Sequence, residues 1–119
     1  MPITSLLRRH QDMRHLPSPN CHGGQGVLDW TIVLEGSEHP QQRIRLHDDV
    51  LPPGASIGEH PAHKEEHYYI LTGNGTALLD GRRLPITAGD VMVVFPGGSH
   101  GLMNDGTAPM RLLVAIACS

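Results

Sequence analysis

The sequence predicts an all-β protein folded as a jelly-roll β-barrel. Fourteen glycines and ten prolines are spread along the chain, and short runs of Val, Ile and Leu lie between them. Apolar runs at such regular spacing indicate roughly eight to ten short strands, an arrangement that favours a jelly roll over an open sheet. The 119 residues suit a single domain that is large enough to form a core without disulfides.

The N-terminal segment is expected to stand apart from the barrel. Residues 1–26 are predicted to form a short N-terminal arm and loop, and residues 27–119 the barrel domain. Thr4 or Ser5 could cap a short helix over residues 6–14, which two prolines shortly afterwards would end. We expect the arm to pack on the barrel or on a partner subunit.

The first strands of the barrel are predicted at two segments that follow the arm. Residues 27–34 are rich in apolar side chains, with Trp30 as the anchor of the strand. Residues 43–51 alternate apolar and polar side chains in their first half, which is typical of a half-exposed strand.

The later strands are predicted from a turn and from a long apolar run. Asp80 and Gly81 form a pair that is favoured in two-residue hairpins, so residues 76–79 and 82–86 should pair antiparallel. Residues 110–118 are apolar almost throughout and should close the sheet.

The strand that begins at Glu66 is apolar on both of its faces. Side chains alternate along a strand, so Glu66, Tyr68 and Ile70 share one face while Tyr69 and Leu71 lie on the other. A strand that is apolar on both sides is usually covered on both sides. We therefore expect one face to line the barrel and the other to meet a second subunit in a homodimer.

Potential metal ligands are concentrated just before this strand. Residues 60–67 hold three histidines and two glutamates, and His60, His63 and Glu66 offer the nitrogen and oxygen donors that bind Zn, Mn, Fe, Ni or Co. His100 follows a Pro-Gly-Gly turn at the end of a second apolar strand. Two strands with a donor at each tip can bring those donors together.

These two stretches resemble the paired sequence motifs of a single-domain cupin. Ala62 stands where the first motif has its second histidine, and Pro96 lies one residue after the usual proline. The motifs and their flanking strands cover residues 51–117, more than half of the chain. The matching positions are Gly54, His60, Glu66 and Gly73 in the first motif and Gly89, Gly97, His100 and Asn104 in the second.

The resemblance implies a cupin jelly-roll β-barrel that holds a divalent metal ion, such as Zn, Mn, Fe or Ni. Its ligands would be His60, Glu66 and His100, with His63 as a fourth if the chain bends at Pro61. Without His63, the set is two histidines and one carboxylate with open positions, an arrangement associated with non-haem Fe(II) oxygen activation.

Three other side chains near the motifs have two interpretations each. Tyr68 faces inward, where it could bond a ligand in the barrel or bond backbone as a core tyrosine. His22 lies in a His-Gly-Gly segment similar to one that often precedes the first strand of cupins, so it either lines the pocket or is an ordinary loop residue. His67 is either a further ligand or a surface or interface histidine, and we expect the latter because strand alternation points it away from Glu66.

Composition and charge indicate the partners, the cellular compartment and the redox state of the cysteines to expect. The net charge of -3 and pI near 6.3 provide no basic surface for nucleic acid. No apolar run approaches the ~20 residues of a membrane span, and the first residues lack the apolar core of a signal peptide, so we expect a cytoplasmic protein. Cys21 and Cys118 are isolated and predicted to be reduced.

Three functions are compatible with these features. The first is a metal-dependent cupin enzyme, either an isomerase or epimerase of sugar-like substrates or a dioxygenase. The second is a non-catalytic module that binds or senses a small oxygen-rich metabolite. The third is a cupin that has lost its metal and uses the barrel for packing or partner contacts. Fold alone does not choose among them.

Overall fold

The computed structural model describes residues 3–118, so residues 1–2 and 119, at the ends of the two predicted domain ranges, lie outside it. Ten β-strands dominate the described chain, which confirms the all-β jelly roll. No helix in residues 3–118 has the length and apolar character needed to cross a membrane. The strands are β1 (Arg14–Pro19), β2 (Val27–Leu34), β3 (Ile44–Leu51), β4 (Ser56–Pro61), β5 (Glu66–Thr72), β6 (Asn74–Leu79), β7 (Arg82–Thr87), β8 (Val91–Val94), β9 (Ser99–Met103) and β10 (Met110–Ala117), and the 3-10 helices are η1 (His10–Asp12) and η2 (Cys21–Gly23).

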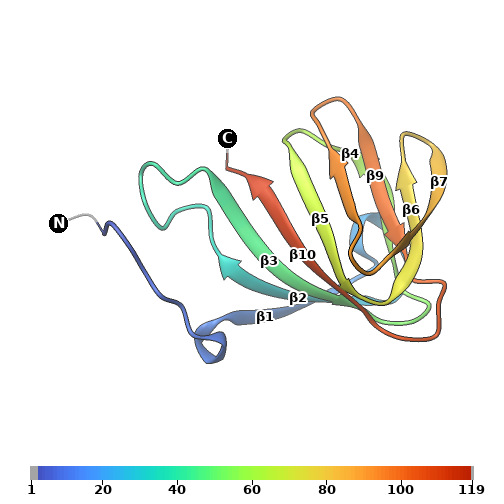
Figure 1. The fold of residues 1–119 in the computed structure, drawn as a ribbon, viewed down its shortest axis with the longest axis horizontal. Coiled ribbons are helices and arrows are strands. Elements are labelled where there is room, and N and C mark those ends of the chain that lie inside the picture. The colour runs from blue at the N-terminus through green and yellow to red at the C-terminus, as the bar shows by residue number, and fades with distance from the viewer. Residues whose placement is uncertain (1–2, 119) are drawn as a thin grey trace.

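The strands form two antiparallel sheets that face each other (Figure 1). The larger sheet has the order β1-β2-β3-β10-β5-β8, and the smaller has the order β4-β9-β6-β7. Every other side chain of the central strands is buried between the sheets, as alternation requires. The largest fully buried side chains are those of Leu51, Ile70, Leu102, Met110, Leu112, His100, Val114 and Asn104.

The hairpin between β6 and β7 confirms the prediction made from its turn. Leu79 pairs with Arg82, which leaves Asp80 and Gly81 as the two turn residues. Both have positive φ, 52° and 77°, the backbone conformation that a type I′ turn requires. Asp and Gly tolerate this conformation better than most residues, so the turn fixes the register of the two strands.

The two predicted faces of β5 are confirmed by burial. Tyr68 and Ile70 are 6% and 0% exposed, whereas Tyr69 and Leu71 are 44% and 36% exposed. On the neighbouring edge strand β8, Val91 is 53% exposed. The outer face of the large sheet therefore carries an uncovered group of apolar side chains in a single copy of the chain.

The prediction of a short helix over residues 6–14 is wrong. Only the single 3-10 turn of η1 forms there, and Arg14 already begins β1, which pairs antiparallel with β2 from Arg14 to Pro19. β1 is the edge strand of the large sheet, where a proline costs no ladder hydrogen bond if its nitrogen faces solvent. Pairing with β2 thus fixes the chain as a strand from Arg14 onward, whereas residues 6–9 before it form neither helix nor strand.

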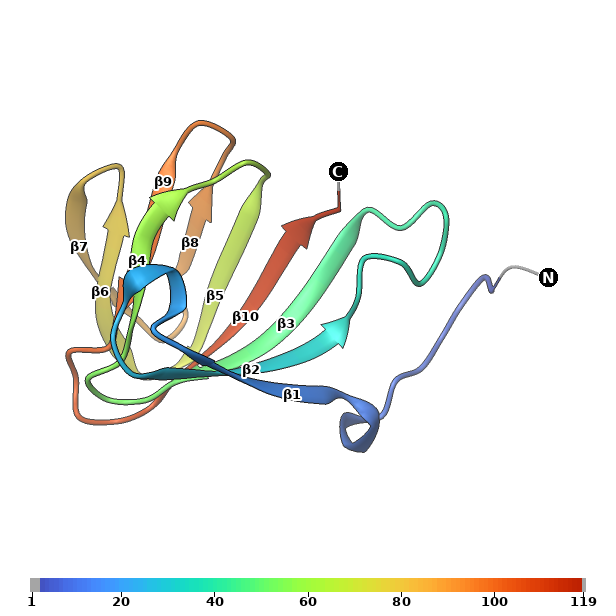
Figure 2. The same ribbon diagram turned by 180° about the vertical axis from the view of Figure 1, so that it is seen from behind.

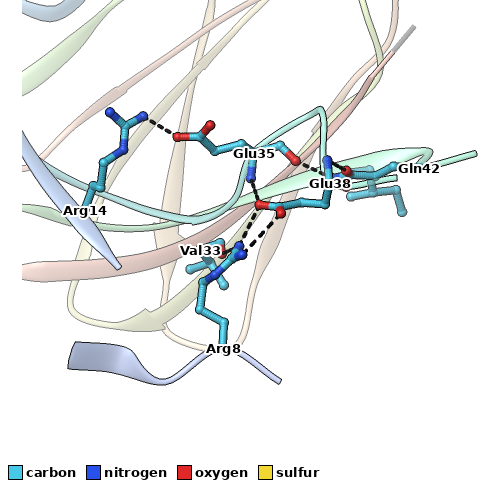
Figure 3. A network of polar contacts seen from close by, with 7 residues as sticks. Arg8, Arg14, Val33, Glu35, Glu38 and Gln42 are labelled. Atoms are coloured by element: carbon cyan, nitrogen blue, oxygen red, sulfur yellow. Dashed lines mark hydrogen bonds and ion pairs between the residues drawn. The ribbon is translucent and has the colours of Figure 1, made fainter. Parts of the chain in front are cut away.

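The arm before β1 extends away from the barrel and is tied to it by polar contacts (Figures 1 and 3). The Arg8 guanidinium donates to both carboxylate oxygens of Glu38, at 2.7 and 3.2 Å, and to the carbonyl oxygen of Val33, at 3.0 Å. Arg14 forms a second ion pair with Glu35. Leu7 in the arm is 74% exposed, so these contacts hold the arm without burying it.

Candidate functional site

A cavity of about 670 Å³ opens inside the barrel. Its walls come from the inner faces of β2, β3, β5 and β10, from β4 of the opposite sheet, and from η2. Figure 2 shows the segment between β1 and β2, which contains η2, curling beside β4. The lining residues are Ser18, Cys21, His22, Leu28, Trp30, Arg45, His47, Asp49, Ile57, His60, Pro61, His63, Lys64, Glu66, Tyr68, Val114 and Ile116.

His60 lines this cavity from β4 and has a defined tautomer. Its Nδ1 lies 2.7 Å from the carbonyl oxygen of Gly58, which can only accept, so Nδ1 carries the proton. Nε2 is left with a free lone pair. Burial lowers the pKa of His60, although the bond to Gly58 acts in the opposite direction. The ring is therefore suited to act as a neutral donor to a cation or an acceptor for a ligand proton.

Glu66, Tyr68 and His100 form a hydrogen-bonded group beside His60. The Tyr68 hydroxyl donates to Oε1 of Glu66 at 2.9 Å, and it lies 2.9 Å from Nε2 of His100. Because the single hydroxyl proton goes to the carboxylate, His100 must donate from Nε2. His100 is fully buried, does not line the cavity, and leaves its Nδ1 without a partner among the described residues.

The charges of this group follow from the same contacts. Burial alone would raise the pKa of Glu66, but hydrogen bonds from His100 and Tyr68 favour the ionised form and leave that pKa lowered. Burial, followed by the adjacent Glu66 charge, raises the pKa of Tyr68. Glu66 is therefore a carboxylate at neutral pH, and Tyr68 keeps its proton.

The donor set fits a cation in part. Nε2 of His100 and Oε1 of Glu66 are 3.3 Å apart, close to the roughly 3.0–3.4 Å between two ligand atoms on a cation with bonds of about 2.1 Å, but Nε2 carries a proton in this arrangement and would have to lose it to bind a cation. The His60 ring lies beside that of His100, with centroids 4.1 Å apart. Even so, no group of three or more His, Cys, Asp or Glu within residues 3–118 has the geometry to hold a metal ion.

The remaining candidate ligands occupy different places. His63 lies in the connection between β4 and β5, where it is exposed and lines the cavity. Ala62, at the position of the missing motif histidine, is 3% exposed and offers no donor. His67 faces outward, as predicted, and bonds the carboxylate of Glu65.

His22 stacks directly on His60. The two ring centroids are 3.4 Å apart and their planes differ by 8°. His22 has a φ of 50°, a conformation that non-glycine residues seldom adopt and that often occurs at functional sites. η2 reaches this position because Gly24 and Gly58 let two backbones meet: a Cβ on Gly58 would lie 2.0 Å from the His22 carbonyl oxygen.

Sequence analysis missed the wall that β3 contributes. His47 and Asp49 are 8% and 4% exposed and line the cavity with Arg45. Burial raises the pKa of Asp49 to about 7 and lowers that of His47 to about 4. The alternation in residues 43–51 does place these side chains on one face, but it does not say that this face is the inner one.

Comparison with known proteins identifies the family. The family described as "Cupin domain" matches residues 48–116. The "Oxalate-binding protein" of Thermotoga maritima is 34% identical over 95% of this chain and 94% of its own length. A crystal structure from Thermotoga maritima, described as a predicted oxalate decarboxylase, superposes with a TM-score of 0.86 at 30% identity and covers 94% of this chain and 98% of that one.

A more distant structure supports the fold alone. The polyketide cyclase RemF from Streptomyces resistomycificus has a TM-score of 0.78 at 20% identity, covering 97% of this chain and 81% of that one. Since the family match spans more than half of the sequence and a full-length relative is 34% identical, the chain belongs to the cupin family.

Proposed function

We propose that this protein binds a small organic carboxylate of the oxalate type in the barrel cavity, at the centre formed by His60, Glu66 and His100. The observation that carries the proposal is that His60 and Glu66 line one cavity and that the buried His100 lies beside both, 3.3 Å from Glu66 and with its ring centroid 4.1 Å from that of His60. The name of the Thermotoga maritima relative, which is similar over almost its full length, supports a carboxylate as the ligand.

We further propose that a divalent cation such as Zn, Mn, Fe or Ni completes the centre. His60, Glu66 and His100 would hold it, and His63 at the cavity wall would replace the histidine absent at Ala62. Such a cation supplies positive charge that attracts and chelates carboxylate oxygens. Tyr68 positions the donors, because its hydroxyl keeps Glu66 and His100 at ligand-like separation.

A second candidate function is turnover of the same ligand. Loss of carbon dioxide from a carboxylate leaves a carbon centre that must receive a proton. Asp49, with its pKa raised to about 7 by burial, is a cavity-lining acid that can hold a proton near neutral pH. Release of carbon dioxide from oxalate, measured with and without added metal, distinguishes an enzyme from a binding module.

Calorimetry tests carboxylate binding. Protein purified without a tag or added metal is analysed for bound metals and then titrated with oxalate before and after chelation. We expect His60→Ala and His63→Ala to lower metal content and oxalate affinity at least tenfold, with the exposed His10→Ala as a matched control. Equal metal content in all four proteins would refute the proposed ligands. If the metal-loaded wild type bound neither oxalate nor a longer dicarboxylate, the proposed ligand class would be refuted.

We also propose that the outer face of the large sheet meets a second copy of this chain. Tyr69, Leu71 and Val91 are exposed there, although the opposite side of the same strands is buried. A matching face on another copy would cover these side chains by two-fold pairing, the commonest arrangement of homo-oligomers.

A further inference from the structure

Arg45 is a half-buried charge that has no counter-ion among the described residues. It lies on β3 with its side chain in the cavity wall, and its Nε is buried without a hydrogen-bond partner among residues 3–118. No carboxylate of the described chain lies within ion-pair distance of its guanidinium, whereas Arg8, Arg14 and Arg111 each have one. The other unpaired arginines, Arg9, Arg43, Arg82 and Arg83, are exposed to solvent.

The neighbours of Arg45 do not neutralise it. His47, two residues along the same face, is kept uncharged by burial and by the Arg45 charge, which lower its pKa to about 4. Asp49 lies further along that face and tends to stay protonated, because burial raises its pKa to about 7. A guanidinium is always charged, and removing it from water without a partner is costly, so the site favours an anion from outside the chain.

The strand register places Arg45 two strands away from Glu66 on the inner face of the large sheet. Arg45 pairs with Ile116 of β10, and Ile116 pairs in turn with Glu66 of β5. Arg45 and Glu66 therefore lie in one row of the inner sheet face, two strand spacings or about 10 Å apart at the backbone. The cavity wall near this row is apolar, with Val114 and Ile116 on β10.

We infer that Arg45 anchors a carboxylate of the ligand, and that this ligand is a dicarboxylic acid whose second carboxylate reaches the centre at its cavity-lining residues, His60 and Glu66. The inference rests on the proposed binding of carboxylates and narrows their class. The two carboxyl groups of oxalate are directly bonded to each other, so oxalate would contact either Arg45 or the centre, but not both. A short methylene chain, as in succinate or glutarate, would span the apolar wall. Guanidinium recognises carboxylate through two parallel hydrogen bonds, and a cavity of about 670 Å³ accommodates the longer acids.

Titration of one set of acids into four proteins tests this assignment. Oxalate, succinate, glutarate and the monocarboxylate butyrate are titrated into wild type, Arg45→Gln, Arg45→Lys and the exposed control Arg83→Gln. We expect wild type to prefer succinate or glutarate over oxalate and butyrate. Arg45→Gln should weaken the preferred dicarboxylate by about 30-fold, as expected for a charge-assisted bond, and oxalate by less than about threefold. Arg45→Lys should fall between, and Arg83→Gln should match wild type.

The outcomes separate the two proposals. If Arg45→Gln binds every acid as wild type does, the Arg45 assignment is overturned and carboxylate binding stands. If wild type binds none of the four acids, carboxylate binding itself fails and the assignment with it. Should Arg45→Gln not fold, the wild type alone gives the answer: the side-chain Nε–H resonance of Arg45 shifts on addition of succinate if the assignment is correct and stays in place if it is not.

Discussion

Tyr68 joins two candidate donors through a single hydroxyl group. We expect Tyr68→Phe to lower the free energy of unfolding by about 1–3 kcal/mol, because it removes one buried and one partly buried hydrogen bond and leaves polar atoms of Glu66 and His100 less satisfied. Urea denaturation at neutral pH measures the loss. Tyr69→Phe is the matched control, since that tyrosine is exposed and its hydroxyl has no hydrogen bond within residues 3–118. An equal effect of both substitutions would contradict the role of the Tyr68 hydroxyl.

Asp49 should make stability depend on pH. Its pKa is raised from 3.8 to about 7 by burial, so the folded protein keeps a proton that the unfolded chain loses at lower pH. Its stabilising contribution is complete below pH 3.8 and is lost as pH rises to about 7. The free energy of unfolding of wild type, relative to Asp49→Asn, should therefore fall by a few kcal/mol across that range, at roughly 1.4 kcal/mol per pH unit.

Denaturation at a series of pH values measures this difference. His47 acts in the opposite direction, because its folded pKa of about 4 lies below the ordinary 6.5, but it is present in both proteins and cancels in the comparison. Asp12→Asn, at an exposed carboxylate, is the control for removing a charge from the surface. A flat difference between wild type and Asp49→Asn would mean that folding does not raise the pKa of Asp49 above its ordinary 3.8.

At the residue scale, motif spacing pointed to side chains that lie close together in the structure, whereas their role as metal ligands stays a prediction. His60, Glu66 and His100 lie at motif positions, and the structure places these side chains next to one another. Arg45 and Asp49 could not be identified in this way. Their position in the cavity depends on how β3 pairs with β2 and β10, contacts between residues far apart in the sequence.

At the level of secondary-structure elements, the contact between η2 and β4 depends on two glycines, Gly24 and Gly58. Gly58→Ala would place a Cβ 2.0 Å from the carbonyl oxygen of His22, a backbone atom that cannot rotate away. We expect η2 to shift, the His22 ring to leave His60, and the free energy of unfolding to fall by about 1–3 kcal/mol.

Denaturation together with the imidazole NMR signals of His60 tests this substitution. Gly36→Ala is a suitable control, since a Cβ there would lie an ordinary 3.7 Å from the Cys118 sulfur. The close fit of η2 would be disproved if Gly58→Ala left both the stability and the His60 signals unchanged.

Strands were easier to predict than the short N-terminal segments. β2 matches its predicted range of residues 27–34, because a run of apolar and β-branched side chains has few alternatives. The segment over residues 6–14 contains plausible helix formers but lacks tertiary contacts that would stabilise a helix there. Its neighbour β1 is instead held by pairing with β2, a contact that local propensity does not reveal.

At the scale of the whole molecule, the exposed apolar face predicts self-association. Tyr69→Lys should place a charge in the proposed dimer interface and weaken association at least tenfold, since an unpaired charge in an apolar contact is costly. Sedimentation equilibrium measures the dissociation constant. Leu84→Lys, on β7 of the other sheet, should leave association unchanged. A monomeric wild type would rule out the dimer.

The residues that line the cavity come from two parts of the chain. The segment that matches the family, residues 48–116, contributes the histidines and glutamate of the centre, whereas His22, Trp30 and Arg45 come from outside it. If the proposed centre and the Arg45 assignment are correct, the residues that bind the common group and those that select the ligand lie in separate stretches of sequence. Exchanging the first 47 residues between cupins would then produce chimaeras that prefer different ligands but bind them at the same centre.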